Sequence, residues 1–182
     1  MLTKDILILR LVIIMARICT FIFFIVLNSP LFGYSQVYNS VVISEIMADP
    51  TPVVGLPDAE YIELHNRTSN VISLKGWKLT SGNRSILLPD STIPPGNFRI
   101  ICHRNNTDLL SVYGKVIGLS SFSLTNDGMA LALYNKQNQL VYSISYQKKW
   151  WDSDKRDGGY SLEMTDLNNP CGEAGNWSVS PG

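Results

Sequence analysis

Glu60–Asn66 reads Glu-Tyr-Ile-Glu-Leu-His-Asn, and this stretch decides the fold class. Ile62 and Leu64 fall on one face of an extended chain, whereas the tyrosine, the second glutamate and the histidine fall on the other. Side chains alternate between the two faces of a β-strand, so this period of two predicts a strand with one buried face.

Short apolar or β-branched runs separated by turn residues continue through the rest of the chain. No long segment has the period of a helix, and only Asp108–Tyr113 is expected to form one or two helical turns. Met129–Tyr134 and Leu140–Tyr146 flank a polar loop, which predicts a β-hairpin. We expect further strands at Val41–Met47, Trp77–Thr80, Ile86–Leu88, Asn97–Cys102 and Tyr160–Met164.

Seven or eight short strands punctuated by Gly, Pro and Asn are typical of an all-β sandwich or a small barrel. The chain from residue 36 to residue 182 is long enough for one hydrophobic core, and no repeat or linker divides it. We therefore expect a single all-β domain over residues 36–182, with Trp77 in its core.

The first 35 residues have the features of a cleavable signal peptide. Arg17 precedes the apolar run Ile18–Leu27, and Gly33 and Ser35 supply the small residues found before a cleavage site. Cleavage after Ser35 leaves Gln36 at the new N-terminus. We expect an exported protein that resides in the periplasm, at the cell surface or outside the cell.

Two alternatives concern this N-terminal segment. Translation from Met15 gives a more typical signal peptide than translation from Met1, because the upstream apolar stretch Ile6–Ile14 is interrupted by Arg10, whereas Met15-Ala16-Arg17 leads directly into the apolar run. Alternatively, Ile6–Leu27 is about long enough for a retained membrane anchor, although Arg10 and Arg17 inside it are costly in a bilayer. We expect contact with a membrane only in this second case.

The charge of the chain gives no reason to expect a nucleic-acid partner. The formal net charge is zero, from 15 basic and 15 acidic residues, whereas nucleic-acid binding depends on clustered Lys and Arg. The sequence contains no Gly-x-Ser-x-Gly elbow and no glycine-rich nucleotide loop. We expect no catalytic residues and no cofactor.

A set of segments in a fixed order carries a family resemblance. They are Ile-Ser-Glu-Ile-Met-Ala-Asp-Pro (43–50), Asp-Ala-Glu-Tyr-Ile-Glu-Leu-His-Asn (58–66), Ile-Ser-Leu-Lys-Gly-Trp-Lys-Leu (72–79), Leu-Thr-Asn-Asp-Gly (124–128), Gly-Gly-Tyr-Ser-Leu-Glu (158–163) and Asn-Trp-Ser (176–178). Together they resemble the lamin tail domain, an immunoglobulin-like module of nuclear lamins that also occurs in exported bacterial proteins. The resemblance spans about residues 41–178 and implies an immunoglobulin-like β-sandwich that binds or scaffolds without catalysing a reaction.

An acidic group is a weak candidate for a calcium site. Glu45, Asp49, Asp58 and Glu60 flank or lie on the connection between two expected strands, with Glu63 close by. Calcium takes six to eight oxygen ligands, which carboxylates near a loop supply. The spacing does not follow a known calcium loop, so structural or solvent-exposed carboxylates are the alternative, and we assign no metal ligand.

Three aromatic residues, Tyr146, Trp150 and Trp151, form a candidate binding surface beside Lys148 and Lys149. Exposed aromatic rings stack on sugars or bases, which points to a carbohydrate-binding or adhesion module. The alternative is that at least one tryptophan lies in the core or faces a partner domain.

Two cysteines remain after signal cleavage, Cys102 and Cys171. An even pair in an oxidising compartment is a candidate disulfide.

These observations favour a non-catalytic exported module that binds a protein or a cell-envelope component. Two alternatives stay open: a carbohydrate-binding or adhesion module, and the accessory domain of a truncated exported hydrolase. The second arises because bacterial relatives are often attached to hydrolases and usually continue beyond the point where this chain stops.

Overall fold

The structure is a computed structural model that describes residues 37–171 and 173–182. The predicted signal peptide and its cleavage site lie outside the described residues. Within the described part of the chain, no helix is both long and apolar enough to cross a membrane.

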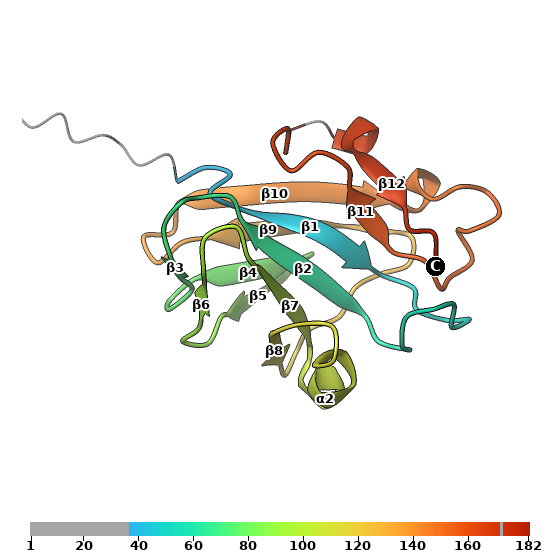
Figure 1. The fold of residues 1–182 in the computed structure, drawn as a ribbon, viewed down its shortest axis with the longest axis horizontal. Coiled ribbons are helices and arrows are strands. Elements are labelled where there is room, and N and C mark those ends of the chain that lie inside the picture. Colours follow the sequence, from blue (N-terminus) through green and yellow to red (C-terminus); the bar gives the residue numbers. More distant parts are fainter. Residues whose placement is uncertain (1–36, 172) are drawn as a thin grey trace, which may run out of the picture. The chain divides into compact units, whose positions relative to one another are not determined.

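Twelve strands and a few short helical turns make up the described domain (Figure 1). The strands are β1 (Val41–Met47), β2 (Tyr61–Asn66), β3 (Ile72–Ser73), β4 (Lys78–Ser81), β5 (Arg84–Leu87), β6 (Thr92–Ile93), β7 (Phe98–His103), β8 (Val116–Leu119), β9 (Gly128–Tyr134), β10 (Leu140–Gln147), β11 (Leu162–Met164) and β12 (Trp177–Val179). The helical turns are η1 (Arg104–Asn106), α2 (Thr107–Leu110), η2 (Lys148–Trp150) and η3 (Glu173–Asn176).

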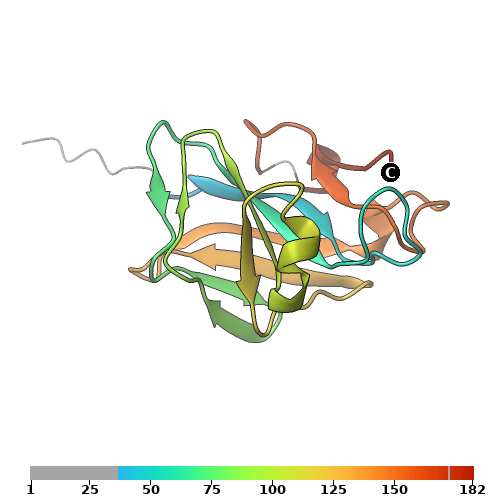
Figure 2. The same cartoon turned by 60° about the horizontal axis from the view of Figure 1, so that its bottom comes forward.

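The strands form two main sheets that pack face to face (Figures 1 and 2). The larger sheet has the order β12-β11-β1-β2-β7-β8, and the smaller has the order β10-β9-β4-β5. Strands β3 and β6 form a separate two-stranded ribbon. All pairings are antiparallel except β7 with β8. The arrangement confirms the all-β, immunoglobulin-like sandwich that the sequence predicted.

A β-bulge in β1 sets which side chains face the core. The pairing of β1 with β2 shifts between Ile43 and Glu45, so Ser44 is the extra residue. Ile43 then pairs with Leu64 and Ile46 pairs with Ile62, all of them fully buried. Without the bulge, Ile43 and Ile46 would point to opposite faces of the sheet, because side chains alternate along a strand.

The main core lies between the two sheets. Apolar side chains of the smaller sheet, including Leu79, Leu131 and Leu133, meet those of β1 and β2 in one continuous buried cluster. Trp77 belongs to this cluster and is 6% exposed, as its sequence context predicted. Burial of this apolar area is the main favourable term in folding.

A second, smaller cluster covers part of the outer face of the larger sheet. It consists of Met47, Ala59, Tyr61, Ile100, Cys102 and Leu110. Leu110 comes from α2, which lies beside β7 and β8 (Figure 2). One half of this outer face is therefore covered and apolar, while the half nearer β11 is left open for polar side chains.

The eight predicted strands match the observed strands to within two residues at each end, and the 129–146 hairpin is confirmed by the pairing of β9 with β10. The expected helical turns at 108–113 are present as α2, although the helix is shorter and begins at Thr107. Four strands were missed: β3, β6, β8 and β12.

Asn66 is a buried hydrogen-bonding centre at the end of β2. It has no exposed surface, and its Nδ2 lies 2.8–3.1 Å from the carbonyl oxygens of Asn70, Ile93 and Pro94. Its Oδ1 accepts hydrogen bonds from the amide and hydroxyl of Thr68 at 2.9 and 2.8 Å. One side chain thus holds two loops together and fixes the turn that follows the strand.

Replacement of Asn66 by alanine should destabilise the domain by about 3 kcal/mol, because several buried polar groups lose their partner at once. Chemical denaturation of the purified protein measures this change. Asn97→Ala is the matched control, since Asn97 is exposed and its side chain donates to one carbonyl, that of Pro95. Its cost should stay below about 1 kcal/mol, and equal costs for the two variants would contradict the assigned role.

Candidate functional site

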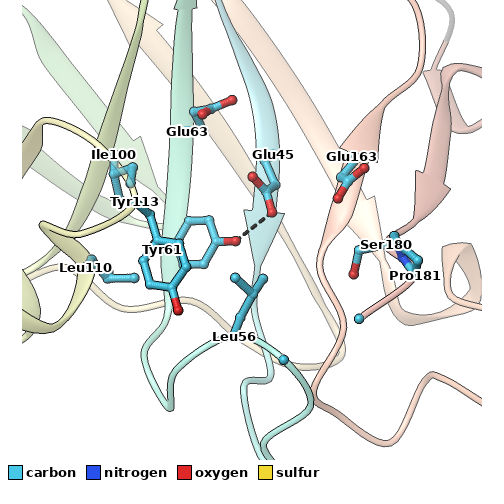
Figure 3. Close-up of a pocket in the computed structure, with 12 residues that line it drawn as sticks. Glu45, Leu56, Tyr61, Glu63, Ile100, Leu110, Tyr113, Glu163, Ser180 and Pro181 are labelled. Atoms are coloured by element: carbon cyan, nitrogen blue, oxygen red, sulfur yellow. Dashed lines mark hydrogen bonds between the residues drawn. The ribbon is translucent and has the colours of Figure 1, made fainter.

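A cavity of about 350 Å³ opens on the outer face of the larger sheet (Figure 3). One wall is apolar and comes from the loop after β1, from β7 and from the α2 region: Leu56, Ile100, Leu110 and Tyr113. The other side carries three glutamates together with the end of the chain: Glu45, Glu63, Glu163 and Ser180–Gly182. Tyr61 lies between the two sides.

Strand register brings the three glutamates side by side. Glu45 on β1 pairs with Glu63 on β2 and with Glu163 on β11. Directly opposed residues on antiparallel strands have Cβ atoms about 5 Å apart. The three carboxylates therefore form a row across neighbouring strands and face the same cavity (Figure 3). We call this set the glutamate row.

Hydroxyl groups hold two members of the row. The Tyr61 hydroxyl donates a hydrogen bond to Glu45 Oε1 at 2.5 Å. The Ser44 hydroxyl donates to Glu63 Oε1 at 2.7 Å, so the bulge residue of β1 supports the glutamate on β2. These neutral donors fix the carboxylates without neutralising their charge.

Burial makes the row a poor place for negative charge. Desolvation, followed by the charges of Glu45 and Glu163, raises the pKa of Glu63 to about 7, although the hydrogen bond from Ser44 acts in the opposite direction. The pKa of Glu163 is also raised, first by burial and then by the charge of Glu45. Burial and the neighbouring Glu45 raise the pKa of Tyr61 as well. Like charges held close together disfavour ionisation.

The chemistry of the cavity suits binding. Its lining contains no cysteine, histidine, lysine or arginine. Among the described residues, no group of three or more His, Cys, Asp or Glu side chains is arranged to hold a metal ion. The mixture of carboxylates with an apolar wall complements a ligand that has both a cationic and an apolar part.

The comparison with known families agrees with this architecture. The sequence model of the lamin tail domain matches residues 35–148. The chain belongs to the lamin tail domain family. Proteins of this immunoglobulin-like family are generally non-catalytic and act as binding or interaction modules. No curated protein matches the chain.

The family match covers only part of the residues that line the cavity. It ends at residue 148, so β1 to β10 lie within it or at its edge, whereas β11 and β12 lie beyond it. The cavity therefore combines residues of the matched part of this lamin tail domain with residues that follow it.

The weak calcium candidates do not come together as a metal site. Glu45 belongs to the glutamate row, whereas Glu60 Oε2 accepts a hydrogen bond from the Leu124 amide at 2.9 Å. Asp58 Oδ1 accepts one from the Thr51 hydroxyl at 2.9 Å and so supports its own loop. Burial raises the pKa of Glu60, and the charge of Asp49 raises it further. Structural roles, the alternative left open by the sequence, therefore describe Asp58 and Glu60.

The predicted aromatic binding surface is wrong for two of its three residues. Tyr146 is 1% exposed and Trp151 is 5% exposed, and their rings meet edge to face with centroids 6.1 Å apart. The Tyr146 hydroxyl donates to the Thr125 carbonyl, and Trp151 Nε1 donates to the Tyr160 carbonyl. Both are core residues with satisfied polar atoms. Trp150 alone is half-buried, and its ring lies 6.4 Å from that of Trp177.

The candidate disulfide is not formed. Cys102 and Cys171 are both free. Cys102 is fully buried on β7 within the smaller apolar cluster, and burial raises the pKa of its thiol to about 11. Cys171 is exposed, and its Sγ lies 3.3 Å from Asn39 Nδ2. The two side chains occupy different environments, which sequence spacing does not reveal.

Sequence reasoning missed most of the cavity. Glu45 and Glu63 both belong to the acidic group that the sequence singles out, but nothing in the sequence links Glu163, Leu56 and Tyr113 to it. The only signal was the resemblance of residues 158–163 to a family segment, and this does not reveal which strand becomes the neighbour of β11.

Trp151 should contribute strongly to the stability of the folded domain, and Trp150 should contribute less to it. Replacement of Trp151 by alanine is expected to cost about 3–5 kcal/mol of unfolding free energy, because it removes a large buried side chain. Trp150→Ala should cost less than about 2 kcal/mol, because that ring keeps contact with water in the folded state. Urea denaturation of both variants measures these losses of unfolding free energy. A larger loss for Trp150→Ala than for Trp151→Ala would refute the assignments.

Proposed function

We propose that this lamin tail domain is an exported, non-catalytic module that binds a protein or a cell-envelope component through the cavity beside the glutamate row. The proposal is supported by the side chains that line this cavity, because the domain belongs to a family of binding modules. Three carboxylates line one side of it and an apolar wall lines the other.

The ligand group that fits best is a basic side chain on the partner. A lysine or arginine presents a cation at the end of an alkyl stem. The cation would lie against Glu45 and Glu163, while the stem would lie along the apolar wall near Leu56 and Ile100. Charge-assisted hydrogen bonds to carboxylates are among the stronger polar contacts in proteins.

Export is the second part of the proposal. The first 35 residues support it through their basic residue, apolar run and small residues before position 36. Such a protein would act in the periplasm, at the cell surface or outside the cell.

The N-terminal residue of the protein recovered after export tests this part. When the full sequence is expressed in an exporting bacterium, the mature protein should begin at Gln36. N-terminal sequencing or intact mass identifies the first residue. Recovery of the unprocessed chain in the membrane fraction would favour the retained anchor instead.

A pair of matched probes tests the binding site. Nα-acetyl-lysine amide should produce saturable NMR shift changes at the amides of Leu56, Ile100 and Glu163. Nα-acetyl-norleucine amide has a similar alkyl stem without the charge, and it should bind at least roughly tenfold more weakly, since a charge-assisted contact is worth about 1.4 kcal/mol or more.

Variants of the row provide the control for this measurement. The double variant Glu45→Gln/Glu163→Gln should lose the preference for the lysine probe and remain folded. Asp90→Asn removes an exposed carboxylate that pairs with Lys75, neither of which lines the cavity, and this variant should bind like the unmodified protein. Equal binding of the two probes, or shift changes spread over the whole surface, would exclude the cavity as a site for cations.

A further inference from the structure

The C-terminal strand pair, β11 and β12, joins the larger sheet through a short contact. β11 pairs with β1 at two register positions, Glu45 with Glu163 and Ile46 with Leu162, whereas β1 pairs with β2 at six. β12 pairs with β11 and forms the edge of the sheet. Strands at an edge with few pairing positions are the first to open in local fluctuations.

One of the two register positions between β1 and β11 opposes like charges. Glu163 lies directly across from Glu45, and Glu45 also faces Glu63 on its other side. Opposed like charges on neighbouring strands destabilise the pairing. The Ile46–Leu162 position and the buried Trp177 of β12 supply the opposing, favourable contribution.

In the part of the chain that the structure describes, no cation forms an ion pair with the glutamate row that would offset the repulsion between its carboxylates. On β2, Tyr61 donates to Glu45, and His65 lies two residues beyond Glu63 on the same face, stacked on Phe98. From β7 the row meets Ile100, and from the α2 region it meets Tyr113 and Leu110. Among the described residues, the two ion pairs are Lys75–Asp90 and Lys148–Asp157, and neither includes a member of the row.

We propose that the glutamate row makes the docking of the C-terminal strand pair onto β1 depend on pH, so that the pair is held tightly in acid and opens more often above neutral pH. Because the segment after β12 contributes Ser180, Pro181 and Gly182 to the cavity, opening of the pair also removes one side of the cavity. The inference rests on the strand register and on the burial of the opposed carboxyl groups, and it does not require the cavity to bind a ligand.

The direction of the pH effect follows from the carboxyl groups. The pKa of Glu63 rises from 4.5 to about 7 on folding, and that of Glu163 also rises. A carboxyl group whose pKa is raised in the folded state favours folding when it is protonated. This stabilisation is complete below about pH 4.5 and is lost as the pH rises through about 7. Loss of the proton from Glu163 introduces charge at the two-position contact between β11 and β1, and loss of the proton from Glu63 introduces charge on the other side of Glu45.

Hydrogen–deuterium exchange of the purified protein at pH 5.5 and pH 8.5, corrected for the intrinsic rate, tests the proposal. The open fraction of residues 160–182 should be about fivefold larger at the higher pH. The amides of β9 and β10 should change less than about twofold, because they lie in the other sheet. Glu163→Gln should remove the pH dependence of residues 160–182 and keep the protein folded.

Two further variants make the result decisive. Glu45→Gln removes the shared neighbour of both other glutamates and should act like Glu163→Gln. Glu173→Gln is the matched control, because Glu173 is exposed, lies in the same C-terminal region and is absent from the cavity lining. Exchange of residues 160–182 that is independent of pH, or pH dependence that persists in Glu163→Gln, would overturn the proposal. So would an equal rise in exchange throughout the domain.

Discussion

The pairing of β1 with β2 through the bulge at Ser44 is the constraint on which the larger sheet depends. The extra residue places Ile43 and Ile46 on the same face although they are three positions apart. The same shift turns Glu45 outward, opposite Glu63. A single local irregularity therefore completes the core on one side of the sheet and builds the glutamate row on the other.

The outer face of this sheet has an apolar half that is covered and an acidic half that is open. On the β7 side, α2 covers the sheet, and Leu110 is 1% exposed against Ile100 and Cys102. On the β11 side, the glutamate row faces a cavity instead of another element. The register that buries Ile43, Ile46 and Leu162 leaves the three glutamates no freedom to separate, because a slip by one residue would expose the core face. The favourable burial of three aliphatic side chains exceeds the modest cost of opposed carboxylates.

Buried asparagine side chains form hydrogen bonds with backbone groups in the turns, where no neighbouring strand is present to pair with them. Asn135 accepts from the amides of Gln137 and Gln139 and so closes the β9–β10 loop. Asn176 is 4% exposed and joins Asp166 and Asn169 at the base of the β11–β12 connection. An asparagine side chain carries both a donor and an acceptor, so it satisfies backbone groups that have no strand partner.

The strands that sequence reasoning found are those long enough to show a period. β3 and β6 have two residues each, which is too short for any alternation. β8 has Gly118 at a position where a Cβ atom would lie 2.5 Å from Thr107 Cγ2. Close packing of the α2 region therefore requires glycine there, and a glycine inside a short strand weakens the sequence signal for that strand. Trp150 and Trp151 are adjacent in sequence, and only the geometry of η2 decides that the second one enters the core.

The cavity was beyond prediction for a topological reason. Glu45 and Glu63 belong to strands that are consecutive in sequence, and consecutive antiparallel strands are usually neighbours, so their proximity was within reach. Glu163 joins them because β11 returns to pair with β1 although nine strands, β2 to β10, lie between the two in sequence. No periodicity in residues 160–164 specifies that neighbour. The third carboxylate of the cavity is thus a property of strand order, because the row would be reduced to Glu45 and Glu63 if β11 paired with any strand other than β1.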